Sequence, residues 1–153
     1  MPAVPFVHLH LHSEYSLADS TIRIGEMVKR CVALSQPAIA VTDVDNLFAA
    51  VKFYKAAEGA GIKPIIGADI GLADGNEAAS RMTLLCRDRG GYLTLSRLLS
   101  RAWMEGHRTD GVALRPEWLR EDNAGLFALV GRNSLAGRMA VGGRHELAEA
   151  WLA

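Results

Sequence analysis

The sequence predicts an α/β fold in which strands and helices alternate along the chain. The first observation is a series of short apolar runs with strand character, at residues 6–12, 37–43, 62–72, 81–87 and 125–131. The second is that segments with apolar residues at helical spacing lie between these runs. Such βα units favour a mainly parallel sheet, and right-handed crossovers allow either an open doubly wound sheet or a closed barrel.

The predicted helices follow the strands in order. In residues 24–34 apolar side chains recur at helical spacing, which indicates an amphipathic helix; they are Ile24, Met27, Val28, Cys31 and Leu34. Further helices are predicted at residues 46–61 and 91–106 and in the last segment, residues 142–153. The last helix runs to the final residue without a C-cap, which predicts that the chain is a piece of a longer protein.

The composition is typical of a soluble globular domain, with half of the residues apolar and 22% charged. Seventeen basic and seventeen acidic residues cancel, so we expect no strong positive field to hold a nucleic-acid backbone. The two cysteines lack CxxC spacing, and no signal peptide or long apolar span is present. These features predict a cytoplasmic protein without membrane contact, in which Cys31 and Cys86 are small buried hydrophobic residues.

Three histidines alternate with aliphatic residues in the stretch FVHLHLHSEYS. Because a strand turns successive side chains to opposite faces, His8, His10 and His12 are expected to share one face. Imidazole is a common metal ligand, and two imidazoles on one strand can meet one ion. The same pattern also fits an edge strand with solvated histidines, and this stretch alone does not separate the two interpretations.

Further candidate ligands follow from the positions of the strand ends. His10 and His12 end the first strand, Asp43 ends the second and Asp69 ends the third. In α/β folds functional groups gather at the carboxyl ends of the strands, and Asp19 lies in the loop at the same edge. Mixed imidazole and carboxylate ligation suits zinc, manganese or iron, and such ions can support phosphoryl transfer.

Simpler interpretations stand beside the ligand roles. Asp43 fits a helix cap or an Asx-turn as well as a ligand, and Asp69 fits an ordinary acid at a strand end. His8 lies deepest in the predicted strand, where a hydrogen bond inside the sheet is expected. His107 and His145 are expected to be solvated.

The chain also resembles a known family over essentially its whole length. The carrying stretches, in order, are FVHLHLHSEYSLADS, AIAVTDVDNLFAAVKFYKAAEGAGIKPIIGAD and GGYLTLSRLLSRAWMEG. Together they resemble the start of the catalytic alpha subunits of bacterial DNA polymerase III. In that family these segments open the PHP (polymerase and histidinol phosphatase) domain, a distorted parallel β/α barrel. The resemblance implies that residues 1–153 form an incomplete PHP barrel, with the palm, fingers and later domains absent.

The resemblance assigns the acids and histidines individually. His10 and His12 match the metal-binding histidine pair of PHP domains, and Asp19 matches the acid that follows it. Asp69 falls where the family has a glutamate or aspartate. Asp43 matches the aspartate of a TDH-like motif, as a residue behind the ligands or in the turn.

Three positions depart from the ligand pattern of the family. Val44 and Arg81 stand where histidines are expected, and Arg132 stands at a further ligand position. Valine cannot ligate, and an arginine adds a fixed positive charge that repels a cation. The resemblance therefore implies a partly dismantled PHP site with at most a residual Zn²⁺ or Mn²⁺ ion.

The resemblance also implies a function for the parent protein. Alpha subunits add deoxynucleotides to DNA in chromosomal replication, with Mg²⁺ held by aspartates of a palm domain that this chain lacks. The implied partners are DNA, deoxynucleoside triphosphates and other holoenzyme subunits, including a proofreading exonuclease and the sliding clamp. This segment itself is expected to scaffold and dock partners. The alternatives are a metal-dependent phosphoesterase or 3′ to 5′ exonuclease, and a small interaction module if the reading frame ends at Ala153.

Overall fold

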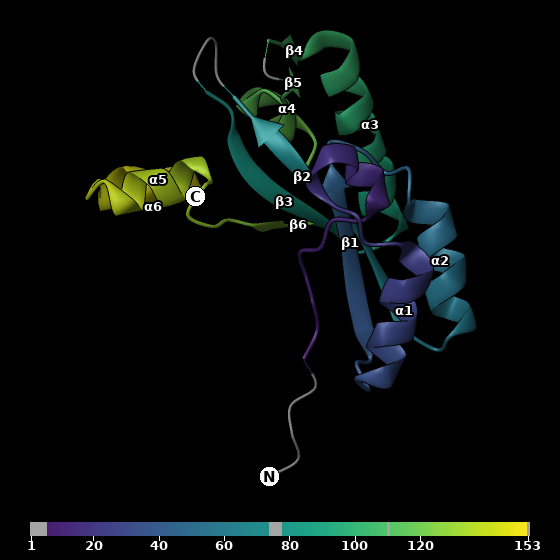
Figure 1. Cartoon of the computed structure of the whole chain (residues 1–153). Coiled ribbons are helices and arrows are strands. Elements are labelled where there is room, and N and C mark those ends of the chain that lie inside the picture. Colours follow the sequence, from purple (N-terminus) through teal and green to yellow (C-terminus); the bar gives the residue numbers. More distant parts are fainter. Residues whose placement is uncertain (1–5, 74–77, 110, 153) are drawn as a thin grey trace. The chain divides into compact units, whose positions relative to one another are not determined.

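The computed structural model describes residues 6–73, 78–109 and 111–152 (Figure 1). The chain forms two compact units, Met1–Ala68 and Asp69–Ala153, called here the first and the second unit. Strand β2 (Lys63–Leu72) begins in the first unit and continues into the second. Among the described residues, no helix has both the length and the apolar character that crossing a bilayer requires.

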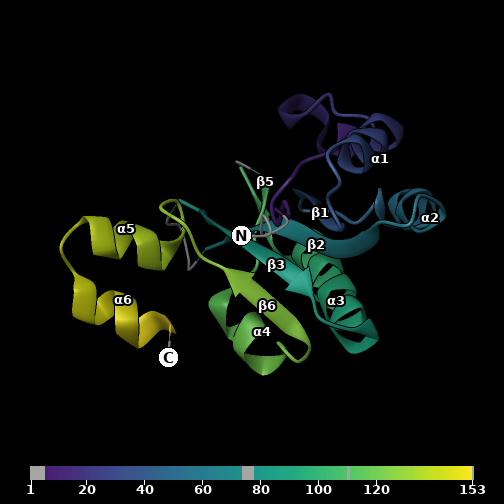
Figure 2. The same ribbon diagram turned by 90° about the horizontal axis from the view of Figure 1, so that it is seen from below.

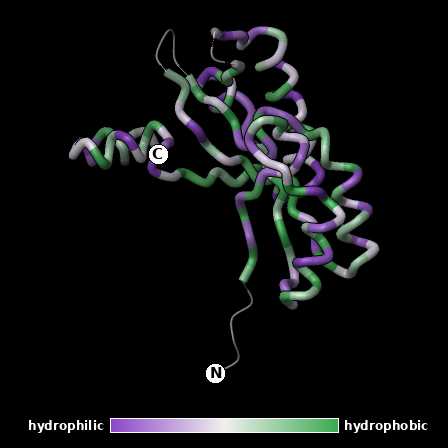
Figure 3. Tube along the Cα trace, viewed as in Figure 1, coloured by the Kyte–Doolittle hydropathy of each residue, from purple (hydrophilic) through white to green (hydrophobic). Residues whose placement is uncertain are grey.

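The first unit contains two helices, a short 3₁₀ segment and two strands. Its elements, in order, are η1 (Glu14–Asp19), α1 (Ile24–Ala33), β1 (Ala38–Val44), α2 (Ala50–Gly59) and the start of β2. Helices α1 and α2 lie side by side (Figures 1 and 2). In Figure 3 these helices alternate between hydrophobic and hydrophilic residues, as expected for helices with one buried face.

The core of the first unit lies between α1, α2 and β1. The buried cluster consists of Ile24, Met27, Val28, Cys31, Ile39, Val41, Ala49, Phe53, Ala57 and Ile62. Four of the five apolar residues by which the sequence predicted the first helix, at positions 24, 27, 28 and 31, are in this cluster. The fifth, Leu34, is the C-cap of α1 and is 50% exposed, so its predicted place on the buried face is wrong. The spacing of the four buried residues is therefore explained by burial of one helix face.

The second unit contains the remaining elements. They are the end of β2, β3 (Ser80–Cys86), α3 (Arg89–Glu105), β4 (His107–Arg108), β5 (Gly111–Val112), α4 (Pro116–Glu121), β6 (Leu126–Leu129), α5 (Leu135–Val141) and α6 (His145–Leu152). Strands β4 and β5 form a separate antiparallel pair. Helices α5 and α6 lie side by side in both ribbon views (Figures 1 and 2). The predicted alternation of strands and helices is confirmed.

The main sheet is open and mixed, with the order β1-β2-β3-β6. The prediction of a mainly parallel sheet is wrong for its second half, because β3 and β6 pair antiparallel, with Thr83 opposite Leu129 and Cys86 opposite Leu126. The physical reason lies in the connection. After α3 the chain adds the β4–β5 pair and α4, so that β6 starts beside the end of β3 instead of beside its beginning.

The prediction of a continuous first strand at residues 6–12 is also wrong. This stretch makes one isolated parallel bridge to β1, between His8 and Ile39. The hydrogen bonds between the stretch and β1 change register after this bridge. The amide of Ala40 donates to the carbonyl of His8 (2.8 Å), and the amide of Thr42 donates to the carbonyl of Leu11 (2.9 Å). The step from His8 to Leu11 is one residue longer than the step from Ala40 to Thr42. An extra residue of this kind forms a bulge, which interrupts a strand and redirects its side chains.

Two glycines bring the start of α3 against the turn before β6. The side chain of Asp88 caps α3 by accepting a hydrogen bond from the amide of Gly91 (3.0 Å). This bond and the neighbouring Arg87 hold the pKa of Asp88 below its usual value. A Cβ atom on Gly91 would overlap the carbonyl oxygen of Gly125, which itself has a φ of +76°. Only glycine therefore allows this close approach of two backbone segments.

A buried tryptophan anchors α4 in the second unit. Trp118 is 3% exposed, and two arginine side chains lie over its ring. The guanidinium carbon is 4.4 Å from the ring centre for Arg101 and 5.1 Å for Arg115. Arg101 also forms an ion pair of 3.0 Å with Glu121. These contacts fix α4 through cation–π attraction as well as burial.

Candidate metal centre

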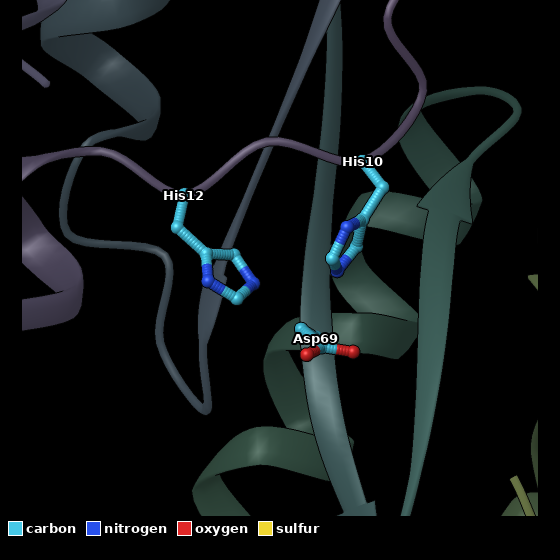
Figure 4. A group of neighbouring side chains, drawn as sticks. All are labelled: His10, His12 and Asp69. Atoms are coloured by element: carbon cyan, nitrogen blue, oxygen red, sulfur yellow. The ribbon is translucent and has the colours of Figure 1, made fainter. Parts of the chain in front are cut away.

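Three of the predicted ligand residues lie close together in the structure. One potential ligand atom from each of His10, His12 and Asp69 lies within 4.8 Å of the other two. Figure 4 shows both imidazole rings on the N-terminal segment, residues 6–13, turned toward the carboxylate of Asp69 on the strand. Two imidazole nitrogens and a carboxylate oxygen form a donor set of the kind that binds zinc or manganese.

Asp69 is positioned by the strand that carries it. It lies in β2 directly after Ala68, and it is 8% exposed. One of its carboxylate oxygens accepts a hydrogen bond from the hydroxyl of Thr83 on β3 (3.2 Å). Asp69 is therefore a strand acid whose orientation is fixed by an adjacent strand.

Asp43 anchors the segment that carries the histidines. Its carboxylate is 1% exposed and accepts three short hydrogen bonds at the end of β1. The donors are the amide of Ser13 (2.6 Å), the hydroxyl of Ser13 (2.7 Å) and the hydroxyl of Ser16 (2.7 Å). Because Ser13 follows His12 directly, these bonds fix the backbone next to the His12 side chain.

Asp43 does not belong to the group of three ligand residues found among the described residues. Its predicted place behind the ligands stays a prediction; the structure shows Asp43 accepting hydrogen bonds from Ser13 and Ser16. The Asx-turn of this region instead belongs to Asn46, whose side-chain oxygen accepts a hydrogen bond from the amide of Phe48 (3.0 Å). The sequence reasoning missed Ser13 and Ser16, although the S-x-x-S spacing before a helix is a recognisable signal of hydroxyl hydrogen bonds to the backbone.

The 13–22 loop is closed by contacts at both ends. The amide of Glu14 donates to the carbonyl of Ile22 (2.8 Å), and the hydroxyl of Ser20 donates to the carbonyl of His12 (2.8 Å). These bonds return the chain to His12, where the carboxylate of Asp19 contacts ring atom Nδ1. Asp19 therefore contacts one of the three grouped residues without belonging to the group.

A charged pair ties the 13–22 loop to α2. The ammonium group of Lys52 lies 2.9 Å from the carboxylate of Glu14 and 5.3 Å from the ring centre of Tyr15. The hydrogen bond from Lys52 holds the pKa of Glu14 below its usual value. The same bond raises the pKa of Lys52, and Tyr15 adds to that shift. The loop is thus held from β1 by Asp43 and from α2 by Lys52.

Leu17 at the outer end of this loop has an unfavourable backbone conformation. Its φ is 49° and its ψ is −101°, a combination that turns use for glycine, and its side chain is 83% exposed. The anchored residues on either side of Leu17 hold it there. Strain of this kind costs stability and persists only where surrounding contacts over-determine the backbone.

Replacing Leu17 with glycine is expected to raise the free energy of unfolding by about 1 kcal/mol, because the strain disappears and little packing is lost. The measurement is urea unfolding followed by circular dichroism. Leu17→Ala is the matched control, since alanine removes the same side chain but retains the Cβ that causes the strain. A glycine variant less stable than the alanine variant would show that Leu17 is not strained.

The three positions that depart from the ligand pattern lie at strand ends and in a turn. Val44 is the last residue of β1, and Arg81 lies near the start of β3. The amide of Arg81 donates to the carbonyl of Asn133 (3.1 Å), so the chain next to Arg132 lies beside β3. Arg81 and Arg132 therefore belong to neighbouring segments of the second unit.

His8 is separated from the other two histidines by the bulge. It lines a groove of about 470 Å³ beside α1, together with Leu11, Met27, Ile39 and other residues. The prediction that all three imidazoles share one face, opposite Leu11, is therefore wrong. His8 makes its sheet contact through its backbone carbonyl.

The cysteines lie outside this group. Cys31 is 2% exposed, and burial raises the pKa of its thiol. Burial and the nearby Asp88 raise the pKa of Cys86 to about 11. Both thiols are therefore protonated near neutral pH. Cys31 is buried as predicted, whereas Cys86 is only partly buried, so the prediction of a buried residue is wrong for Cys86.

Comparison with known families identifies the domain. The family model of the PHP domain matches residues 8–151, which is nearly the whole chain and includes His10, His12 and Asp69. This chain belongs to the PHP domain family. The predicted resemblance is thereby confirmed.

The curated relatives of this PHP domain are much longer proteins. It is 53% identical to the DNA polymerase III subunit alpha of Xylella fastidiosa strain Temecula1 over 100% of this chain. It is 40% identical to the corresponding subunit of Escherichia coli K12 over 89% of this chain. The chain spans 14% of the length of the first relative and 12% of the second.

A solved structure supports the fold of this PHP domain. An amidohydrolase from Chromobacterium violaceum, determined with bound sulfate and no metal, superimposes with a TM-score of 0.50. The match covers 63% of this chain and 32% of the amidohydrolase, at 23% sequence identity. At this level of identity the likeness supports the common α/β fold alone.

Proposed function

We propose that this chain is the N-terminal PHP segment of a DNA polymerase III alpha subunit that replicates the bacterial chromosome in the cytoplasm. The observation that carries the proposal is 53% identity to one such subunit over the whole chain, at 14% of that subunit's length. The parent would join deoxynucleoside triphosphates to DNA, with Mg²⁺ held by a palm domain outside these residues. Polymerisation is therefore assigned to the parent, and this segment alone is expected to be inactive.

The proposed role of the segment is to scaffold the parent and to dock other holoenzyme subunits, among them a proofreading exonuclease and the sliding clamp. Its open sheet would be part of a distorted β/α barrel that following chain completes. Support for a scaffold role comes from three positions at which the resemblance leads us to expect metal ligands. Two of the expected ligand positions carry Arg81 and Arg132, and a third carries Val44, none of which binds a cation.

The polymerase proposal is tested on the polypeptide that the complete gene encodes. It is expected to extend a primed template with deoxynucleoside triphosphates and Mg²⁺, and a truncated protein that ends at Ala153 is expected to have no such activity. A stop codon directly after codon 153, with no polymerase domain downstream, would refute the proposal.

The residual site fits a single transition-metal ion. His10, His12 and Asp69 supply two nitrogen donors and one oxygen donor within a short distance, as in zinc sites with three protein ligands. A bound Zn²⁺ or Mn²⁺ would supply Lewis acidity and a water of lowered pKa. The residues of the chain would hold the ion, and Asp43 would keep the histidine segment in position through Ser13 and Ser16.

The chain is expected to bind one equivalent of Zn²⁺ or Mn²⁺, as measured by titration calorimetry and by elemental analysis after dialysis. His10→Ala is expected to weaken binding by more than about 100-fold, since even the partners of metal ligands contribute about 10- to 100-fold. His145→Ala is the matched control, because that exposed histidine lies on α6. Two or three tightly bound ions per chain would contradict the proposal of a partly dismantled site. A chain that binds no ion would contradict the proposal of a residual site.

A metal-dependent phosphoesterase or 3′ to 5′ exonuclease is the second candidate function. The grouping of His10, His12 and Asp69 favours it, because nucleases of this class need a preorganised metal site. The full-length protein would then remove nucleotides from a single-stranded 3′ end in the presence of Mn²⁺. That activity would be lost on chelation and in His10→Ala, whereas the scaffold role predicts no activity in either protein.

A further inference from the structure

A groove beside α1 opens onto the core of the first unit. It has a volume of about 470 Å³, and its lining includes the core residues Met27, Cys31 and Ile39. None of the described residues of α2 lines this groove. The groove, called here the α1 groove, therefore lies on a flank of α1 that α2 does not cover.

The rim of the α1 groove carries apolar side chains that are open to solvent. Leu34 is 50% exposed and Ile22 is 43% exposed, and both line the groove. Leu34 lies at helical spacing from Met27 and Cys31, so it is an apolar position of the helix that the core of the first unit leaves exposed. A further element laid in the groove would bury both side chains and extend the core across it.

Two arginines flank the α1 groove, seven residues apart on one helix. Arg23 is the N-cap residue of α1 and Arg30 lies in its last turn, and both line the groove. About 10 Å of helix separates them. Neither forms an ion pair with a described residue, whereas Glu26, the acid on the groove, pairs with Lys29 (3.0 Å). The α1 groove is therefore apolar with a positive edge.

We propose that the α1 groove is the docking surface for an amphipathic helix from the part of the parent polypeptide that follows residue 153, with carboxylates that face Arg23 and Arg30. An apolar groove suits an amphipathic helix, because the apolar stripe of the helix fills the groove while its polar face stays in water. Acidic residues about seven positions apart share one face of such a helix, which matches the spacing of the two arginines.

The length of the parent polypeptide supplies this occupant. The inference rests on the proposed function, in which this chain is one segment of a much longer protein. The chain spans 14% of the length of the relative to which it is 53% identical, so most of such a parent lies outside these residues. A helix of the same polypeptide is also present at high effective concentration, so a modest apolar contact with two ion pairs is sufficient to hold it.

Carbodiimide cross-linking of the polypeptide that the complete gene encodes tests the contact. The reagent joins a lysine amine to a carboxylate that touches it, forming an amide bond while the carbodiimide takes up the water that is lost. In the Arg30→Lys variant, the new amine is expected to couple to an aspartate or glutamate beyond residue 153, as identified by mass spectrometry of proteolytic peptides. The Arg23→Lys variant is expected to couple to a second acid, about seven positions from the first.

Lys29 provides the internal control for this reaction. Its ammonium group already lies 3.0 Å from Glu26, so these two residues are expected to couple in every protein. New cross-links found only within residues 1–153, only between two copies of the protein, or not at all would overturn the docking proposal. A polypeptide without polymerase activity would refute the proposed function, whereas its cross-link from residue 30 to the following chain would still support docking.

Amide hydrogen exchange measures the same docking without a cross-link. In the complete polypeptide, the amides of α1 are expected to exchange about 10-fold faster when Arg23→Glu and Arg30→Glu are combined, because two attractions become repulsions and α1 opens more often. Lys29→Glu is the matched control, since that side chain is 75% exposed and does not line the groove. Equal acceleration in Lys29→Glu, or in a protein that ends at Ala153, would show an effect on α1 itself and would refute docking.

Discussion

Replacing Asp43 with alanine is expected to lower the free energy of unfolding by about 3 kcal/mol, because three hydrogen bonds to a buried carboxylate are lost. The amide and hydroxyl of Ser13 and the hydroxyl of Ser16 would be left without this acceptor beside β1. The measurement is urea unfolding of both proteins, followed by far-ultraviolet circular dichroism. We also expect weaker zinc binding, since the same bonds hold the segment that carries His12.

Two further variants separate the anchor from a general effect of charge removal. Ser16→Ala removes one of the three donors and is expected to cost about 1 kcal/mol. Glu26→Ala removes an exposed carboxylate that pairs with Lys29 on α1, and we expect a change below about 0.5 kcal/mol. A loss for Asp43→Ala as small as that for Glu26→Ala would show that the buried carboxylate is not an anchor.

Replacing Gly91 with alanine is expected to destabilise the second unit by about 2 to 3 kcal/mol, the usual cost of overpacking a close contact. The added methyl group would overlap the backbone carbonyl of Gly125, which has no side-chain freedom with which to move away. Because the start of α3 must then shift from β6, the cap made by Asp88 would be disturbed as well. Thermal unfolding monitored by tryptophan fluorescence measures the effect.

Gly25→Ala is the matched control for this substitution. Gly25 is also near the start of a helix, but a Cβ atom there would meet no atom within 4 Å. Alanine is therefore expected to stabilise α1 by about 0.5 to 1 kcal/mol, through its helix propensity alone. If Gly91→Ala also proved stabilising, the close approach to Gly125 would not be a feature of the folded protein.

The sequence predicted the helices of this fold better than the arrangement of its strands. Apolar spacing located α1 because Ile24, Met27 and Cys31 all point into one core. Strand direction depends instead on what lies between two strands, and the addition of β4, β5 and α4 after α3 reversed the direction of β6. The bulge between His8 and Leu11 was equally hidden, because one extra residue leaves the apolar pattern unchanged and alters only the hydrogen-bond register.

The residues of the candidate site could be predicted where their side-chain type and their position at a strand end were sufficient. His10, His12 and Asp69 were expected at one edge of the sheet, and the structure brings these three together. Their role as metal ligands stays a prediction. The contact between His12 and Asp19 and the anchoring of Ser13 by Asp43 depend on how the 13–22 loop folds back. That path requires a positive φ at Leu17, which nothing in a leucine side chain signals.

The positions of the tryptophans determine which part of this chain reports on unfolding in a fluorescence measurement. Trp103, Trp118 and Trp151 all follow Ala68, so the first unit has only tyrosines as strong near-ultraviolet chromophores. Trp118 is buried and lies against two guanidinium groups, and its emission is expected at short wavelength in the folded state. Indole fluorescence therefore reports on the second unit, whereas loss of the Asp43 anchor in the first unit must be followed through the amide signal.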